Sequence, residues 1–318
     1  MLEQDWTPLS ALNIFVKDMG IVVSTARATQ FPLPVASVAE QLYISASAKG
    51  YGKEDDAGLV RLFLQEPENS TITGPTSSLE VSKSLDKTPT KVAVFNLDDL
   101  GCDLAVSFAN SGFNVHVFDV DGTKAAGDGS SPRNQQNCRS SCRQRIHIIA
   151  LNSLSVTGKN LAKQLADLGT GISLIDAPVC HGGSSKESPT TTMLYSGTDT
   201  AIGRASGIIA AAHGAFDRVR QVSGGLGSAS TVKLIDQMLS GIQLLAAAEA
   251  MAFASHLSLS TSQIFHFVRS AAAWSWMLET RVPMMLEGAW APPSQSRFEA
   301  PLSTLARDLG WFLERQRS

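Results

Sequence analysis

The stretch that decides the fold reads Lys91-Val-Ala-Val-Phe-Asn-Leu-Asp-Asp-Leu-Gly101 and continues through Asp103–Ser111 to Asn114-Val-His-Val-Phe-Asp119. Its first part, Val92–Phe95, is a short apolar run typical of a buried strand, and its last part alternates as a strand does. Between them, Asp103–Ser111 has a helical pattern that Gly112 ends. Strand, helix and strand in succession predict a βαβ unit and therefore a parallel sheet.

The same pattern continues downstream. Ile146–Ile149 and Ile172–Ile175 are further strand-like runs, and Gly158–Leu168 between them is helical. At roughly 20–25 residues per strand-helix step, the region holds about four strands, where a full dinucleotide-binding fold has six. Residues 122–145, rich in Arg, Ser, Gln and Cys, have no usable periodicity and indicate lost or misread sequence. We expect a shortened Rossmann-like α/β domain over residues 91–222.

Helical segments lie on both sides of this domain. Before it, two alanine-rich stretches are separated by Phe31-Pro-Leu-Pro34, and a Ser/Thr/Pro/Gly-rich linker follows. The expected helices are Val22–Gln30, Val35–Ala48, a short one opening at Glu54-Asp-Asp56, Lys233–Ala254, Ser260–Arg269 and Ser275–Leu286. The expected divisions are a helical piece (1–66), the linker (67–90), the α/β domain (91–222) and a helical substrate or dimerisation domain (223–318).

The composition excludes several classes of protein. Lys and Arg number 26 against 29 Asp and Glu, a net charge of −3, whereas a general nucleic-acid binder carries a basic excess. Four cysteines do not make a disulfide framework, and Cys138 and Cys142 lack the second pair of a zinc site. Residues 1–5 lack the apolar core of a signal peptide, and the longest apolar run, Met238–Ala254, is too short and polar for a membrane span. We expect a soluble cytoplasmic protein without metal, nucleic-acid or membrane partners.

The turn after the first strand stands where a dinucleotide-binding fold places the glycines that let its backbone approach the pyrophosphate. Of the pattern G-x-G-x-x-G only the third glycine is present, and Asp98 puts a negative charge where the diphosphate lies. Asp119 ends the second strand near the ~20-residue spacing after the turn at which an acidic residue binds the cofactor ribose. Together with Asp121 it favours NAD over NADP. The alternative is that Asp119 is an ordinary turn aspartate. The candidate cofactor residues are Asn96, Leu97, Asp98, Asp99, Leu100, Gly101 and Asp119.

A second glycine-rich segment, Asp176-Ala-Pro-Val-Cys-His-Gly-Gly183, follows a buried strand. A turn of this kind can present backbone N–H groups to a carboxylate. Cys180 and His181 are the residue types of a nucleophile–base pair, although adjacent residues rarely face each other productively.

A third segment, Ser223–Lys233, is a flexible turn into the long helix, with Ser228 as the expected N-cap. Lys233 and Gln237 are four residues apart and share a helix face. A partly buried lysine beside an amide can give or take a proton, and an ordinary surface lysine is the alternative reading.

Together these motifs resemble the β-hydroxyacid dehydrogenase family, which includes 3-hydroxyisobutyrate and L-threonate dehydrogenases and is related in fold to 6-phosphogluconate dehydrogenase. The landmarks follow the family order: Lys91–Asp119 resembles the cofactor turn, Asp176–Val179 the substrate loop, Gly227–Lys233 the catalytic-lysine motif, and Trp274–Pro292 with Arg307–Gly310 the helical domain. The resemblance implies a Rossmann-like domain, a long interdomain helix and an all-α domain.

The resemblance also implies a reaction and its residues. In the family, a hydride passes between a nicotinamide cofactor and the hydroxyl carbon of a small hydroxy acid. The resemblance implies that Lys233 exchanges the proton of the substrate hydroxyl and that the Gln237 amide helps to hold the substrate. The expected partners are that small acid and a second copy of the chain in a homodimer. The substrate-binding candidates are Cys180, His181, Gly182, the closing pair Lys17 and Asp18, and its second copy Arg307 and Asp308.

An internal repeat fits this resemblance. Met1–Pro8 matches Met285–Pro292 at five of eight positions, and Lys17–Gly20 matches Arg307–Gly310. The interpretation is a window of a tandem two-unit protein, of the kind found in larger fungal and plant proteins. Residues 21–66 would then complete the second unit like a circular permutant and bring Lys17 and Asp18 to its site; a domain-swapped dimer would achieve the same.

Departures from the family pattern leave three interpretations open. Asn96 and Asp98 replace two glycines, Cys180-His181-Gly182 stands for Ser-Gly-Gly, Ala229 replaces a glycine, and Arg307 replaces the closing lysine. The chain is an active or impaired NAD(P)-dependent dehydrogenase, a catalytically inactive module that binds a partner or forms oligomers, or a truncated gene product.

Overall fold

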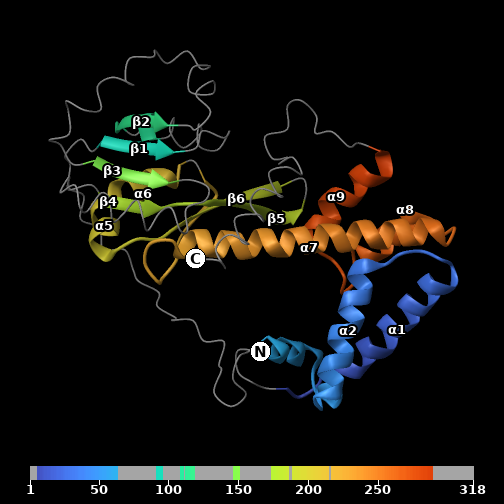
Figure 1. The fold of residues 1–318 in the computed structure, drawn as a ribbon. Helices are drawn as coiled ribbons and strands as arrows, with labels where there is room; N and C mark the ends of the chain where they lie inside the picture. Colours follow the sequence, from blue (N-terminus) through green and yellow to red (C-terminus); the bar gives the residue numbers. More distant parts are fainter. Residues whose placement is uncertain are drawn as a thin grey trace. The chain divides into compact units, whose positions relative to one another are not determined.

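A computed structural model describes residues 6–63, 91–95, 108–110, 112–118, 146–150, 173–185, 188–214 and 216–288. Over these residues the chain forms two compact units (Figure 1). One unit contains the described residues between 91 and 241. The other combines residues 6–63 with residues 242–288, which lie at opposite ends of the sequence.

The α/β unit is built on a four-stranded parallel sheet, as predicted. Its strands are β1 (Lys91–Phe95), β2 (Asn114–Phe118), β3 (Ile146–Ala150) and β4 (Ser173–Asp176), in the order β2-β1-β3-β4. β1 pairs in register with β2 on one side and β3 on the other, so the chain reverses its direction of progress across the sheet at β1. In open parallel sheets, ligands bind outside the carboxyl ends of the strands at such a switch point.

A second, three-stranded sheet was not predicted. It contains β5 (Val179–Ser185), β6 (Ser188–Tyr195) and β7 (Arg218–Gln221), with β5–β6 antiparallel and β6–β7 parallel. The two sheets are joined where Asp176 and Ser196 exchange backbone hydrogen bonds of 2.9 and 2.8 Å. The expectation of a glycine-rich turn over residues 176–183 is therefore wrong for most of its length, because β6 supplies a partner that makes this segment an edge strand.

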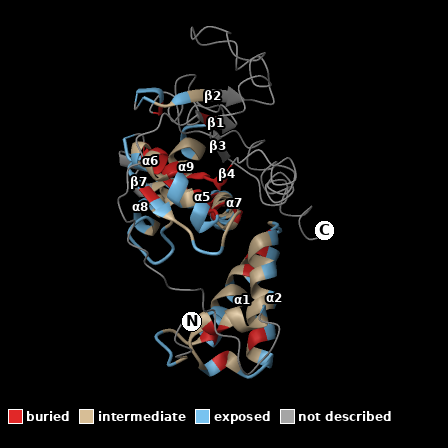
Figure 2. Cartoon of the chain, turned by 90° about the vertical axis from the view of Figure 1, so that its left-hand side faces the viewer, coloured by how far each residue is buried: buried red, intermediate tan, exposed pale blue. Residues whose placement is uncertain are grey.

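The helices α5 (Asp199–Arg204) and α6 (Ser206–Ala212) pack with both sheets around one apolar core. Figure 2 marks buried residues in red around β4, α5 and α6. Each large aliphatic side chain buried in this way contributes about 1.5–3 kcal/mol. The main core residues are Val92, Phe108, Ile175, Val179, Met193, Tyr195, Ile208 and Val219.

The long helix α7 (Ser228–His256) has 29 residues and extends beyond the predicted 233–254 at both ends. Of the helices described, α7 alone has the length and composition that could cross a membrane. Its last turns pack within the helical unit, where Ala247 and Met251 are buried with Leu278 and Val282.

The other helices of the helical unit are α1 (Leu12–Ala28), α2 (Pro34–Ala48), the 3₁₀ helices η1 (Tyr51–Lys53) and η2 (Asp56–Leu62), α8 (Thr261–Val268) and α9 (Trp276–Glu287). Of these, α2, α8 and α9 lie within one residue of their predicted bounds, whereas η1 was not predicted. α1 begins about ten residues earlier than predicted. Pro34 occupies the first turn of α2, where its missing N–H costs no hydrogen bond.

Contacts between the start of α2 and the end of α7 join the two sequence segments of the helical unit. The Glu249 carboxylate accepts hydrogen bonds from the backbone N–H groups of Val35 (2.9 Å) and Ala36 (3.0 Å). Glu249 thus caps α2 from another segment of the chain, where a negative charge also complements the helix dipole. The Phe31 ring lies between Phe253 and His256, at centroid distances of 5.5 and 4.8 Å.

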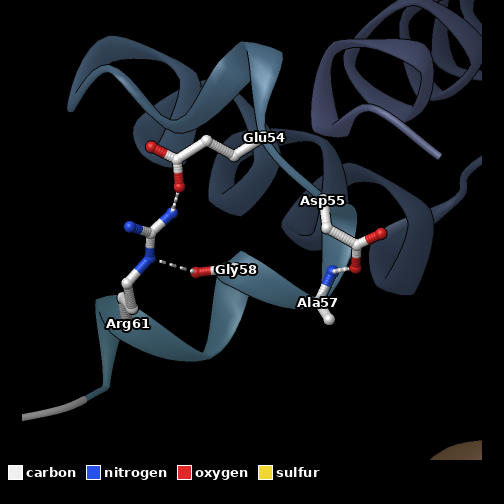
Figure 3. Close-up of polar contacts among 5 residues, drawn as sticks. All are labelled: Glu54, Asp55, Ala57, Gly58 and Arg61. Carbon is white, nitrogen blue, oxygen red and sulfur yellow. Dashed lines mark hydrogen bonds and ion pairs between the residues drawn. The ribbon is translucent and has the colours of Figure 1, made fainter. Parts of the chain in front are cut away.

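The end of the N-terminal segment is held by Arg61. Its guanidinium pairs with the Glu54 carboxylate, and its Nε donates to the Gly58 carbonyl at 3.3 Å (Figure 3). The same group lies over the rings of Tyr51 and Trp6, 3.6 and 4.6 Å from their centroids. These contacts fold residues 51–61 back against the start of the segment.

The acids predicted to open a short helix do so. The Asp55 carboxylate caps η2 by accepting from the Ala57 N–H at 3.0 Å (Figure 3), and its other oxygen accepts from the Leu9 N–H at 2.9 Å. These hydrogen bonds lower the pKa of Asp55. The cap therefore favours the ionised carboxylate.

Candidate functional site

The candidate site begins at Asp176, a buried carboxylate at the carboxyl end of β4 with 3% of its surface exposed. One of its oxygens accepts from the Ser230 N–H at 2.9 Å and from the Ser196 hydroxyl at 3.2 Å, and the other accepts from the Ser230 hydroxyl. The Ser196 oxygen in turn accepts from the Ala229 N–H at 3.0 Å. We call these four residues the clasp, because they tie β4 to the first turn of α7.

The clasp caps α7 from outside the helix. The first N–H groups of any helix lack partners within it, and here Asp176 and Ser196 accept two of them. Burial raises the pKa of Asp176, and the hydrogen bonds from Ser230 and Ser196 oppose that rise. The expectation of Ser228 as N-cap is wrong: Ser228 is already helical, because the Thr231 N–H donates to the Gly227 carbonyl.

Lys233 and Gln237 lie on α7 in the turns that follow the clasp, as predicted. Asp236 shares their face, three residues after Lys233, and was missed in the sequence analysis. The signal that could have found it is that same spacing. The three side chains therefore form one polar row on the helix.

Cys180 on β5 interacts electrostatically with Lys233 and with Asp236. Burial raises the pKa of the Cys180 thiol to about 11, the Asp236 carboxylate adds to the rise, and Lys233 opposes it. The thiol is thus neutral near pH 7, so Cys180 does not have the thiolate that a nucleophile requires. This argues against a Cys180–His181 nucleophile–base pair.

The strand β5, which carries Cys180, His181 and Gly182, lies at the edge of its three-stranded sheet. An edge strand leaves alternate backbone N–H and C=O groups outside the ladder. A Cβ atom built on Gly182 meets no atom within 4 Å, so the space beside this residue is open.

The closing-pair candidates Lys17 and Asp18 lie on α1 in the helical unit. The Lys17 Nζ atom is 3.0 Å from an Asp18 oxygen, with side-chain exposures of 66% and 50%. Both groups are therefore accessible to solvent.

The remaining predicted site residues lie outside the described residues: Asn96, Leu97, Asp98, Asp99, Leu100, Gly101, Asp119, Arg307 and Asp308. The predicted helix 158–168 and residues 122–145 also lie outside them. Within the part of the chain that the structure describes, no three His, Cys, Asp or Glu residues are grouped as a metal site.

A family model described as NAD-binding of NADP-dependent 3-hydroxyisobutyrate dehydrogenase matches residues 1–63 and 227–317. These two stretches include the described residues of the helical unit and the row on α7.

Among curated proteins, the L-threonate dehydrogenase of Escherichia coli K12 is 52% identical over 63 residues, 20% of this chain and 21% of that protein. An uncharacterized oxidoreductase of Synechocystis is 31% identical over 140 residues, 43% of this chain and 47% of that protein. The chain thus spans between about a fifth and about half of the length of these relatives.

A solved structure of 3-hydroxyisobutyrate dehydrogenase from Salmonella typhimurium has the same fold, with a TM-score of 0.51 and 22% identity, covering 72% of this chain and 87% of that one. The predicted fold of a Rossmann-like domain with a helical domain is confirmed. The segments matched by the family model and by these relatives therefore resemble the β-hydroxyacid dehydrogenase family.

Proposed function

We propose that the protein is an NAD(P)-dependent oxidoreductase of small β-hydroxy acids. The observation that carries this proposal is the clasp, which fixes the first turn of α7 to the end of β4. Lys233 follows three residues after Ser230, and its charge lowers the pKa of Cys180 on β5. A lysine held at a fixed point is suited to proton transfer, which depends on position as well as on pKa.

The roles of the chain's own groups follow from this placement. Lys233 exchanges the proton of the substrate hydroxyl, and Gln237, one turn further on, orients that hydroxyl by hydrogen bonding. At the free edge of β5, between Cys180 and Gly182, the backbone N–H of His181 offers a hydrogen bond to the substrate carboxylate. From the family resemblance we also propose a substrate-binding role for Lys17 and Asp18, or for their second copy Arg307 and Asp308.

The parallel sheet fits a nicotinamide cofactor at the carboxyl ends of β1 and β3. When bound, the cofactor supplies the acceptor or donor of the hydride. The turn at residues 96–101 would face its pyrophosphate, and Asp119 would bind its ribose. Asp121 adds a charge that repels a 2′-phosphate, so we propose NAD as the preferred cofactor. We also propose that the enzyme is cytoplasmic.

The test is oxidation of 3-hydroxyisobutyrate, L-threonate and glycerate by the whole chain with NAD and with NADP, followed by nicotinamide absorbance. We expect turnover with NAD that falls by at least about 100-fold in Lys233→Ala, the usual size of a general acid–base contribution. Lys49→Ala, which removes an exposed lysine at the end of α2, is the matched control. Equal rates in Lys233→Ala and the wild type would contradict the role of Lys233.

A second candidate function is a catalytically inactive oligomerisation module. It is favoured by a row of exposed apolar side chains on α7: Val232, Ile235 and Leu239 are 40, 49 and 49% exposed. Such a row at helical spacing suits a second copy of the chain. If the row forms the dimer interface, Ile235→Glu gives a monomer by light scattering, whereas an unchanged mass excludes that interface.

A further inference from the structure

The polar row on α7 holds one ionisable group that the proposed reaction does not use. Asp236 lies three residues after Lys233 and one before Gln237, so it faces the same side as the two residues proposed to act on the substrate. It is also more exposed than either of them. Asp236 therefore occupies the rim of the Lys233 site.

The clasp brings this rim to β5. Asp176 and Ser230 are hydrogen-bonded to each other in the clasp. Cys180 follows Asp176 by four residues and Lys233 follows Ser230 by three, so both side chains lie within a few residues of the same hydrogen bond. Cys180, Lys233 and Asp236 each interact electrostatically with the other two. Desolvation raises the pKa of Asp236, and the Lys233 charge opposes this rise.

The charges of this cluster differ from those of a simple anion site. A lysine alone would attract any carboxylate, and a dicarboxylate more than a monocarboxylate. A carboxylate on the same face repels a second negative charge and accepts hydrogen bonds from hydroxyl or ammonium groups.

We propose that Asp236 is a specificity-determining residue of the Lys233 site, which selects hydroxy acids whose far carbon bears a hydrogen-bond donor and rejects those bearing a second carboxylate. This inference rests on the proposed function for the nature of the ligand. Binding of the acid requires no cofactor, so it can be tested apart from turnover.

Cys180 serves as an internal probe of the cluster. The rate at which iodoacetamide alkylates Cys180 in the whole chain is measured by mass spectrometry of its peptide, which separates it from the other cysteines. Asp236→Asn removes a negative neighbour and should raise this rate by about threefold or more, whereas Lys233→Gln should lower it. Asp199→Asn, which removes an exposed acid at the start of α5, is the matched control and should leave the rate unchanged.

Specificity is measured by how well glycerate and tartronate protect Cys180 from alkylation. The two acids differ at one position, where glycerate bears a hydroxymethyl group and tartronate a second carboxylate. We expect glycerate to protect the wild type at about tenfold lower concentration than tartronate, and Asp236→Asn to abolish this preference. An unchanged preference in Asp236→Asn, or no protection by either acid, would overturn the proposal. Absence of NADH binding with preserved protection would instead refute only the oxidoreductase function.

Discussion

Replacing Asp176 by alanine tests whether the clasp holds α7 to the sheet. Three hydrogen bonds end on this carboxylate, two from Ser230 and one from Ser196. A buried donor left unpaired costs about 1–3 kcal/mol, so three give an upper bound of roughly 9 kcal/mol. The hydroxyls of Ser196 and Ser230 can rotate toward other acceptors, which reduces this cost. Removing the carboxylate also removes the cost of its desolvation, which is evident from its raised pKa. We therefore expect Asp176→Ala to lower the free energy of unfolding of the α/β unit by about 2–4 kcal/mol.

The assay uses the distribution of tryptophan. Three of the five tryptophans, Trp6, Trp274 and Trp276, are described residues of the helical unit, so tryptophan fluorescence reports mainly on that unit while far-UV circular dichroism also follows the α/β unit. In urea, Asp176→Ala should shift a circular-dichroism transition and leave the fluorescence transition in place. Asp199→Ala is the control, with a loss below about 1 kcal/mol. A loss below about 1 kcal/mol in Asp176→Ala, or an equal shift of both transitions, would refute the clasp.

The same position predicts a pH dependence. The folded-state pKa of Asp176 lies above its ordinary value of 3.8, so the folded protein holds this proton more tightly than the unfolded chain. Its contribution to stability is complete below pH 3.8 and is lost as the pH rises through the folded-state pKa. Relative to Asp176→Asn, which cannot titrate, wild-type stability should therefore fall as the pH rises above 3.8. A difference that is independent of pH would contradict this reasoning.

Three further predictions concern other parts of the chain. Glu249→Ala removes the cap of α2 and should lower the stability of the helical unit by about 1–2 kcal/mol, measured by tryptophan fluorescence in urea; no change would show that the two sequence segments do not depend on this cap. Arg61→Ala removes an ion pair and stacking on two rings and should cost about 1–2 kcal/mol by the same measurement, whereas Arg27→Ala should cost less than about 0.5 kcal/mol. Asn96→Gly with Asp98→Gly should tighten NADH binding at least tenfold, and up to on the order of a thousandfold, in a fluorescence titration; unchanged affinity would show that this turn does not contact the cofactor.

The elements with strong local patterns were predictable from the sequence. Val92–Phe95 is a continuous apolar run, and Ile172–Ile175 is apolar except for Ser173, a pattern typical of strands buried on both faces of a parallel sheet. The long helix was predictable because its apolar residues recur at helical spacing over Lys233–Ala254 without a proline, and the single Gly241 does not interrupt the pattern.

The second sheet was not predictable because β5 has little strand propensity of its own. Its residues, Val179–Ser185, are mostly small and polar, and the strand exists because β6 pairs with it. The signal present in the sequence was the β-branched run Thr190-Thr-Thr192 in β6, which indicates a strand but does not name its partner.

The candidate site was predictable only in part, for a similar reason. The spacing of Lys233 and Gln237 places them on one helix face. The hydrogen bonds of Asp176 to Ser230, by contrast, join residues 54 apart in sequence, and those of Glu249 to Val35 join residues 214 apart. Local sequence patterns carry no information on such distant pairs.

The measurement that tests the central claim most directly is a titration of the whole chain with NADH and NADPH, followed by nicotinamide fluorescence. The account predicts saturable binding below about millimolar concentration, tighter for NADH than for NADPH because of Asp119 and Asp121. No saturable binding of either dinucleotide up to millimolar concentration would contradict the assignment of oxidoreductase activity to this chain.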